Sequence, residues 1–239
     1  MVPIRDDNPT TTTPYVTYGL IAANVLAFLY EASLPPQQLT GFLHLAAVVP
    51  RELSASFHGT AVNQLVPEWV TLITSQFLHG GLLHLAGNML FLWIFGNNVE
   101  EKLGHIKYLF FYLTCGVLAS LTQWYFSQNS SIPSLGASGA IAGVLGAYIL
   151  RFPQAEILGI IPLGIFFPSF RVPAFYFLGF WFLEQAFYGF VSLETPTNIG
   201  MESGGIAYWA HSGGFLFGAI LAPLLGLFSD KPREESLYQ

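Results

Sequence analysis

The side chain best suited to nucleophilic chemistry is Ser138, in the glycine-rich segment GASGAIAG. A serine hydroxyl attacks poorly until a neighbouring base accepts its proton, and histidine is the side chain whose unperturbed pKa lies nearest neutrality. His211, in the segment AHSGG, is the natural base. Simpler interpretations stay open for both residues. Small residues like those around Ser138 also pack membrane helices together, and a single histidine at a helix end is often bonded to a loop carbonyl.

A second polar pair, His84 and Asn88, lies in an apolar segment. The two residues are four positions apart, so on a helix both side chains project from one face. A neutral imidazole N–H and a side-chain amide can both donate to the oxyanion that forms during acyl transfer. A hydrogen-bonded pair that merely holds two helices together explains the same spacing equally well.

The placement of acidic residues limits the mechanism. The only aspartates, Asp6, Asp7 and Asp230, lie near the chain ends and outside the apolar segments. This excludes a Ser-His-Asp triad and an intramembrane aspartyl protease, so the predicted catalytic unit is a Ser-His dyad. The H-E-x-x-H spacing of zinc proteases is absent and no carboxylate accompanies the histidines. We therefore expect neither a metal nor another cofactor.

The elements that must position these residues are membrane helices. Hydrophobic residues make up 53% of the 239 residues and charged residues 9%, and the mean hydropathy is +0.53. The net charge of −6 and the lack of a basic run argue against nucleic-acid binding. The single cysteine, Cys115, can form no intrachain disulfide. The polar start of the chain does not resemble a cleaved signal peptide.

Several long apolar blocks approach the roughly 20 residues that a transmembrane helix needs. They run over residues 15–30, 82–99, 108–126, 138–152, 172–190 and 206–228. We predict an all-α membrane protein, a bundle of six transmembrane helices forming one domain over residues 15–228, with cytoplasmic tails at 1–14 and 229–239. The stretch 31–68 is too broken by proline and charge to span, and is expected to be a long interfacial first loop.

The basic residues predict the orientation of the bundle, because Lys and Arg prefer the cytoplasmic side. With six spans, only Arg51 of the eight basic residues falls on the outer face. The other basic residues share the inner face with both termini; they are Arg5, Lys102, Lys107, Arg151, Arg171, Lys231 and Arg233.

The fourth block is too short to cross the bilayer. About 15 residues give roughly 22 Å of helix, against about 30 Å of hydrocarbon. Arg151 marks its cytoplasmic end, so the end that carries Ser138 is expected to be recessed beside a polar cavity. Glycine pairs at helical spacing, Gly139 with Gly143 and Gly214 with Gly218, would let the fourth and sixth helices approach closely.

Taken together, these motifs resemble those of the rhomboid intramembrane serine proteases, over nearly the whole chain. The stretches that carry the resemblance are TSQFLHGGLLHLAGNMLFLWIFGNNVEEKLG, SLGASGAIAG and AHSGGFLFG. The resemblance implies a nucleophilic Ser138, His211 as general base, and an oxyanion hole formed by His84, Asn88 and the Ser138 backbone N–H. It also implies an accessory, structural or water-retaining role for His79.

The resemblance extends to one further element, and the chain departs from the family pattern at two positions. Gly96, Glu100 and Gly104 match a family element that looks structural. Ala142 stands where some family members place an aromatic residue against the catalytic histidine, so here the imidazole must be held otherwise. Thr71 stands where many relatives carry an arginine in the outer loop, so the anchoring of that loop is expected to differ.

The resemblance also implies what this protein would act on. We expect single-pass transmembrane substrates that enter sideways from the lipid bilayer, with the aromatic fifth segment as a candidate lateral gate. Glu184 within it is expected to be protonated or bonded to a neighbouring helix. The expected location is a prokaryotic inner membrane. A non-catalytic rhomboid-like client-binding protein and a small-solute transporter are the alternatives, and the oligomeric state is left open.

Overall fold

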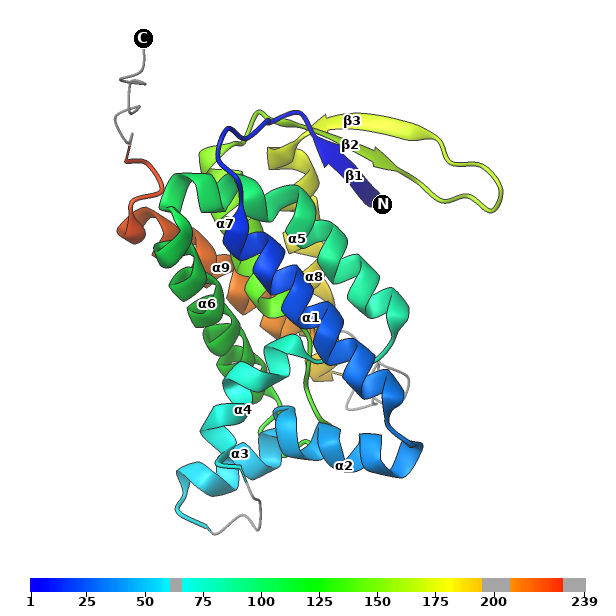
Figure 1. The fold of residues 1–239 in the computed structure, drawn as a ribbon, viewed down its shortest axis with the longest axis vertical. Helices are drawn as coiled ribbons and strands as arrows, with labels where there is room; N and C mark the ends of the chain where they lie inside the picture. Colours follow the sequence, from blue (N-terminus) through cyan, green and yellow to red (C-terminus); the bar gives the residue numbers. More distant parts are fainter. Residues whose placement is uncertain (61–65, 195–206, 230–239) are drawn as a thin grey trace.

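Helices form most of the computed structural model, which describes residues 1–60, 66–194 and 207–229 (Figure 1). The long helices are α1 (Tyr15–Ser33), α5 (Leu82–Leu103), α6 (His105–Phe126), α7 (Ser138–Arg151), α8 (Ala174–Glu194) and α9 (Tyr208–Leu225). They lie where the apolar blocks predict helices, with ends that differ by a few residues. Among the described residues, α1, α5, α6 and α9 are long and apolar enough to cross a membrane, and α7 is a shorter apolar helix.

The segment between α1 and α5 contains short helices, as expected for the first loop. They are α2 (Pro36–Ala46), α3 (Pro50–Phe57), α4 (Glu68–Thr74) and a 3₁₀ turn, η1 (Ser75–Phe77). Val48, Leu53 and Leu72 form a small apolar cluster that packs against Trp124 of α6. This loop therefore folds onto the bundle at the same end as the start of α7 (Figure 1).

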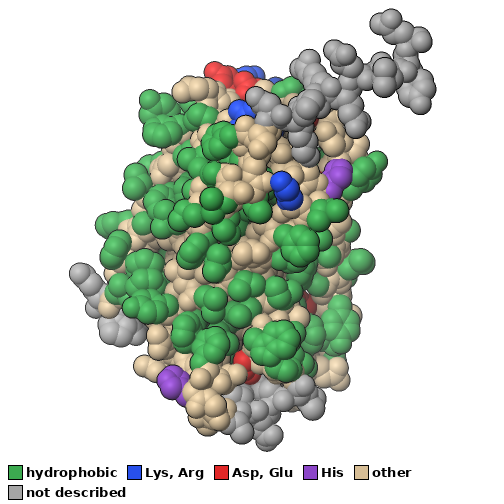
Figure 2. All heavy atoms as spheres, turned by 90° about the vertical axis from the view of Figure 1, so that its left-hand side faces the viewer, with side chains coloured by type: hydrophobic (Ala, Val, Ile, Leu, Met, Phe, Trp, Pro, Cys, Tyr) green, Lys and Arg blue, Asp and Glu red, His purple; other side chains and the backbone are tan. Residues whose placement is uncertain are grey.

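Helix α7 is the most enclosed part of the bundle. Every residue from Gly139 to Tyr148 is buried, with α9, α6 and α5 packed around them. The surrounding helices turn large apolar side chains outward, as shown by Trp93 at 57% and Leu83 at 89% exposure. Hydrophobic side chains cover much of the lateral face in Figure 2, and the charged groups gather mainly at its ends. Such a surface fits lipid as its solvent.

A three-stranded antiparallel sheet is the feature that the all-α prediction missed. Its strands are β1 (Val2–Asp6), β2 (Glu156–Ile160) and β3 (Ser169–Pro173), in the order β1-β2-β3. The residues expected to be a cytoplasmic N-terminal tail therefore include a paired strand. Periodicity could not show this pairing, because β1 is too short to carry a pattern and its partner lies about 150 residues away in the chain.

Asp6 fastens this sheet to the helices. Its Oδ2 accepts hydrogen bonds from the Tyr148 hydroxyl at 2.6 Å and from Asn98 Nδ2 at 3.0 Å. Burial raises the pKa of the Asp6 carboxyl, and the hydrogen bond from Tyr148 opposes that rise. The sheet thus lies at the opposite end of α7 from Ser138 (Figure 1).

Glu100, which is buried in α5, holds the start of α1. The backbone N–H groups of Val16 and Thr17 donate to its carboxylate at 2.9 and 2.8 Å, and the Thr17 hydroxyl donates at 2.7 Å. His105 Nδ1 lies 2.6 Å from the same carboxylate. The N–H groups in the first turn of a helix have no partner within it, and a carboxylate there also interacts favourably with the helix dipole. The expectation of a structural element around Glu100 fits this arrangement.

We expect Glu100→Ala to lower the free energy of unfolding by about 2–4 kcal/mol, because it leaves the buried N–H groups of α1 without an acceptor. Equilibrium unfolding in mixed detergent micelles measures the change. Glu101→Ala is the matched control, since the hydrogen bonds that Glu101 accepts from Thr11 are exposed, and it should change stability by about 0.5 kcal/mol or less. Equal losses for the two variants would contradict this role of Glu100.

Candidate active site

Ser138 is the first residue of α7, and a fixed loop places it there. Gly136 has φ +126°, a backbone conformation that residues with a side chain rarely adopt. Its backbone N–H donates to the Ser75 carbonyl at 2.9 Å, and Ser134 pairs with Val48 on the first loop. The irregular segment before Ser138 is therefore attached to η1 and to the first loop. At this helix start, backbone N–H groups have no partner within α7.

His211 lies in the first turn of α9, beside the serine. Its Nε2 is 2.8 Å from Ser138 Oγ, which is hydrogen-bonding distance. The neighbouring backbone N–H of Ala210 donates to Gln123 Oε1 of α6 at 3.2 Å. Two residues 73 positions apart in the chain are thus brought into direct contact at one end of the bundle.

Close packing of α7 on α9 makes this contact possible. A side chain on Gly218 would overlap the backbone of Gly143, and one on Gly214 would overlap the carbonyl oxygen of Gly139. The two helices therefore touch backbone to backbone. This is the close approach that the paired glycines predict.

Two residues of α8 hold the histidine, and sequence reasoning did not find them. Gln185 Oε1 lies 2.7 Å from His211 Nδ1, and the ring of Trp181 stacks on the imidazole with centroids 5.6 Å apart. Because Gln185 Oε1 can only accept a hydrogen bond, Nδ1 carries the proton and Nε2 is left free to accept one from Ser138. The available signal was a lone amide four residues after a tryptophan in an apolar helix.

The neighbouring charged residue, Glu184, points elsewhere. Its side chain is exposed on α8, whereas Gln185 is buried at 5% exposure. Within the described part of the chain, no hydrogen bond joins Glu184 to another helix, so its expected bond across the bundle is not seen there.

His84 lies near the start of α7, beside the glycine that precedes Ser138 by two positions. A Cβ atom placed on Gly136 would be 3.0 Å from His84 Nε2 and 3.6 Å from Ser138 Oγ, so the imidazole and the hydroxyl flank the same glycine. Asn88 is on the same helix, one turn further. Its Nδ2 is buried and has no hydrogen-bond partner among the described residues, which leaves a donor available.

His79 is buried beside these residues. Its ring centroid is 5.1 Å from that of His84, and its backbone N–H donates to the Glu31 carboxylate at 3.2 Å. This contact links the turn before α5 to the end of α1. It is compatible with a structural role, which stays a prediction.

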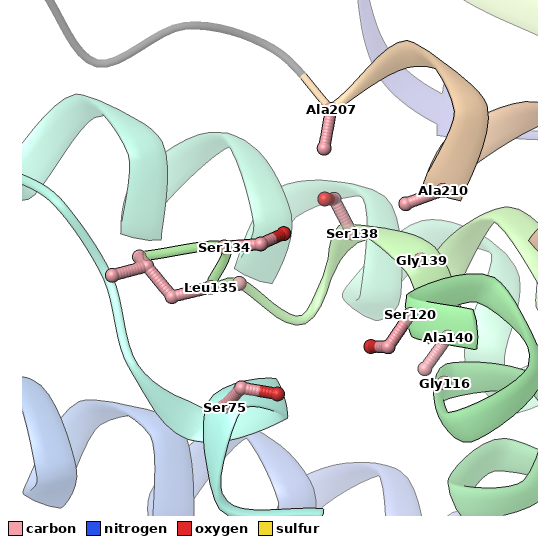
Figure 3. A pocket seen from close by; sticks show the side chains of 11 residues that line it. Ser75, Gly116, Ser120, Ser134, Leu135, Ser138, Gly139, Ala140, Ala207 and Ala210 are labelled. Atoms are coloured by element: carbon pink, nitrogen blue, oxygen red, sulfur yellow. The ribbon is translucent and has the colours of Figure 1, made fainter. Parts of the chain in front are cut away.

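A small polar cavity of about 20 Å³ lies against Ser138. Figure 3 shows Ser75 and Ser120 beside it, with Ser138 projecting from the start of α7 near Ala207 and Ala210. This volume is enough for about one water molecule. In the ranges that the structure describes, no group of three or more His, Cys, Asp or Glu side chains could hold a metal ion.

The two departures from the family pattern have structural counterparts. Ala142 is fully buried against α9, with its Cβ 3.3 Å from the position of a Cβ on Gly214, so a larger side chain would force the helices apart. Trp181 supplies the ring contact to His211 instead. Thr71 is buried in α4, and its hydroxyl donates to the Glu68 carbonyl at 2.6 Å.

The sequence was compared with protein families and with known proteins. The model of the Rhomboid domain matches residues 66–228, which include Ser138, His211, His84 and Asn88. The chain belongs to the rhomboid family. Together with the long apolar helices, membership makes this rhomboid-family protein an integral membrane protein.

Individual relatives come from several organisms. The chain is 31% identical over 174 residues to "Rhomboid-like protein 11, chloroplastic" of Arabidopsis thaliana, covering 72% of this chain and 58% of that protein. It is 31% identical over 172 residues to "Rhomboid protein 1, mitochondrial" of Saccharomyces cerevisiae, covering 70% of this chain and 45% of the relative. "Rhomboid protease GluP" of Bacillus subtilis is 43% identical over 93 residues, or 38% of this chain and 18% of the relative. The chain thus spans only part of the length of each.

We expect Gly218→Ala to destabilise the protein by about 1–3 kcal/mol, because the added methyl group meets backbone rather than a side chain that can move. Thermal unfolding in detergent measures the loss. Gly179→Ala on α8 is the control: nothing lies within 4 Å of its Cβ position, so it should leave stability unchanged or raise it slightly. If both variants unfold alike, the backbone contact of α7 and α9 does not limit stability.

Proposed function

We propose that this rhomboid-family protein is an intramembrane serine endopeptidase that hydrolyses peptide bonds in or near the transmembrane segments of single-pass membrane proteins. The observation that carries the proposal is the 2.8 Å contact between Ser138 Oγ and His211 Nε2, with Gln185 on the far side of the imidazole. The printed name of the Bacillus relative, a rhomboid protease, supports the same activity.

The proposed reaction begins when Ser138 Oγ attacks the scissile carbonyl carbon and its proton passes to His211 Nε2. The negative charge then develops on the former carbonyl oxygen. The Ser138 backbone N–H, His84 and Asn88 are the proposed donors to that oxygen, because the His84 ring flanks Gly136 beside the serine and Asn88 Nδ2 is unpartnered among the described residues.

His211 then gives the proton to the leaving amine as the C–N bond breaks, which leaves an ester on Ser138. His211 next takes a proton from a water molecule, and that water hydrolyses the ester. Gln185 and Trp181 act as positioning residues, because they touch the imidazole and not the substrate. No charged partner is required for this step: a neutral amide orients the ring, as expected in a site of low dielectric where an additional buried charge is costly.

The proposed setting is a bundle of six spans with both termini on the cytoplasmic side. In that topology the dyad lies near the outer face, at the recessed end of α7, and the first loop lies on the same side. The aromatic surface of α8 is the proposed entry side for substrates in the bilayer. Residence in a prokaryotic inner membrane stays a prediction, since the relatives named above include chloroplastic and mitochondrial proteins.

The first test is cleavage of a model single-span substrate by purified protein in liposomes. Ser138→Ala and His211→Ala should each reduce cleavage by roughly 10³-fold or more, because nucleophile and base act as one unit. Thermal unfolding shows whether the variants remain folded, and a mechanism-based serine-hydrolase probe should label only the native Ser138. Continued cleavage by Ser138→Ala would refute the mechanism, and a folded native protein that neither cleaves nor reacts with the probe would favour client binding.

A second test concerns Gln185. Gln185→Leu replaces the acceptor at His211 Nδ1 with an apolar side chain of similar size. We therefore expect kcat to fall roughly 10–100-fold with little change in KM. Gln185→Glu keeps the acceptor and adds a charge that stabilises the protonated imidazole. The acidic limb of its pH–activity profile should therefore move to higher pH. An unchanged profile together with an unchanged kcat in Gln185→Leu would show that the contact plays no part in positioning the base.

A further inference from the structure

The chain between α7 and α8 forms a hairpin that projects beyond the bundle. Strands β2 and β3 pair from Glu156 to Ile160 and from Ser169 to Pro173, and the pairing continues beyond them. The Ile161 N–H donates to the Pro168 carbonyl at 3.0 Å, and Leu163 and Phe166 exchange hydrogen bonds of 2.9 and 3.1 Å. Gly164, at φ +63°, makes the turn. At about 3.3 Å per residue the arm reaches roughly 25 Å from its base.

The tip of this hairpin, residues 161–168, is apolar and exposed. Ile165 is 85% exposed, Phe166 69%, Leu163 59% and Phe167 58%. No charged residue occurs between Glu156 and Arg171. A convex cluster of large apolar side chains is unfavourable in water, so this tip needs an apolar environment.

The position of the hairpin identifies that environment. Strand β3 runs directly into α8, whose first turns expose Phe175, Tyr176 and Phe180 on the lateral surface. The apolar tip lies at the same end of the bundle as these residues and projects sideways (Figure 1). The base of the sheet is polar instead: Arg171 pairs with Glu156 at 3.5 Å, and Arg5 lies nearby on β1. Apolar tip and charged base match the two layers of a membrane surface.

We propose that the hairpin tip inserts into the bilayer leaflet at the end of the bundle opposite Ser138, and so anchors the sheet and the start of α8 to lipid. The backbone sets the depth. Both outer strands of the sheet leave edge groups unpaired within the described residues, so the hairpin cannot enter the hydrocarbon centre. It lies at the boundary of headgroups and acyl chains, with Arg5 and Arg171 at the level of the lipid phosphates.

Lipid fits this tip better than a protein partner does. The tip is a narrow two-stranded turn of eight residues, and a stable interface between two copies would need about 800 Å² from each partner. The same surface continues onto helix faces that lipid already covers in an integral membrane protein. The inference does not depend on proteolysis, so it can be tested whatever the activity.

The experiment places an environment-sensitive fluorophore on Ile165→Cys in protein reconstituted into liposomes, and measures quenching by lipids that carry nitroxide at shallow or deep acyl positions. Cys115 is fully buried and does not compete for the label. Thr12→Cys, an exposed position in the loop between β1 and α1, is the matched control. We expect a blue-shifted emission at position 165 and at least about twofold stronger quenching than at position 12, greatest with the shallow nitroxide.

A second variant distinguishes insertion from general closeness to the membrane. Phe166→Asp combined with Phe167→Asp should abolish the quenching of the label at position 165 while leaving thermal unfolding unchanged, because these side chains touch lipid and not the core. Equal quenching at positions 165 and 12 would overturn the proposal. So would a blue-shifted emission at position 165 that appears only at high protein-to-lipid ratio, which would indicate a second copy of the chain. A blue shift that appears only when a substrate is added would also overturn it.

Discussion

The backbone contact between α7 and α9 is the constraint on which the rest of the structure depends. Ser138 opens one of these helices and His211 lies in the first turn of the other, so the distance between the helices sets the distance between the two side chains. Gly143 and Gly218 leave no room for even a methyl group between them. Lipid supplies no hydrophobic force that would hold helices together, so this close van der Waals packing must do so.

Among the described residues, the carboxylates that hold the fold together make no hydrogen bond to His211. Glu100 is buried and Asp6 half-buried, and from the far end of α7 they bind the start of α1 and the sheet to the bundle. At the Ser138 end, the imidazole is held by an amide and an indole. Carboxylates thus hold the fold together at both ends of the bundle, Glu31 among them near His79, while neutral groups hold the imidazole of His211.

Features of the fold and site could be predicted from the sequence where they depend on local residue patterns, and not where they depend on contacts between distant segments. The start of α7 at Ser138 and its contact with His211 could be predicted because polar residues in apolar segments are conspicuous, whereas the oxyanion role of His84 and Asn88 stays a prediction. Gln185 was missed because neighbouring helix positions differ by about 100° in direction, and only the packing of α8 decides that position 185 faces inward rather than 184. The sheet was missed because its first strand pairs with residues far along the chain, which local patterns do not record.

Helix α8 both borders the lipid and orients the imidazole. Its outer side chains, such as Phe180 and Phe187, are exposed, while Trp181 and Gln185 on its inner side contact His211. An outward displacement of α8 would carry both contacts away from the ring. The imidazole would then be free to rotate, and it would regain its orientation when the helix returned. Under the proposed function, entry of a substrate past α8 and attack by Ser138 would then occur at different times.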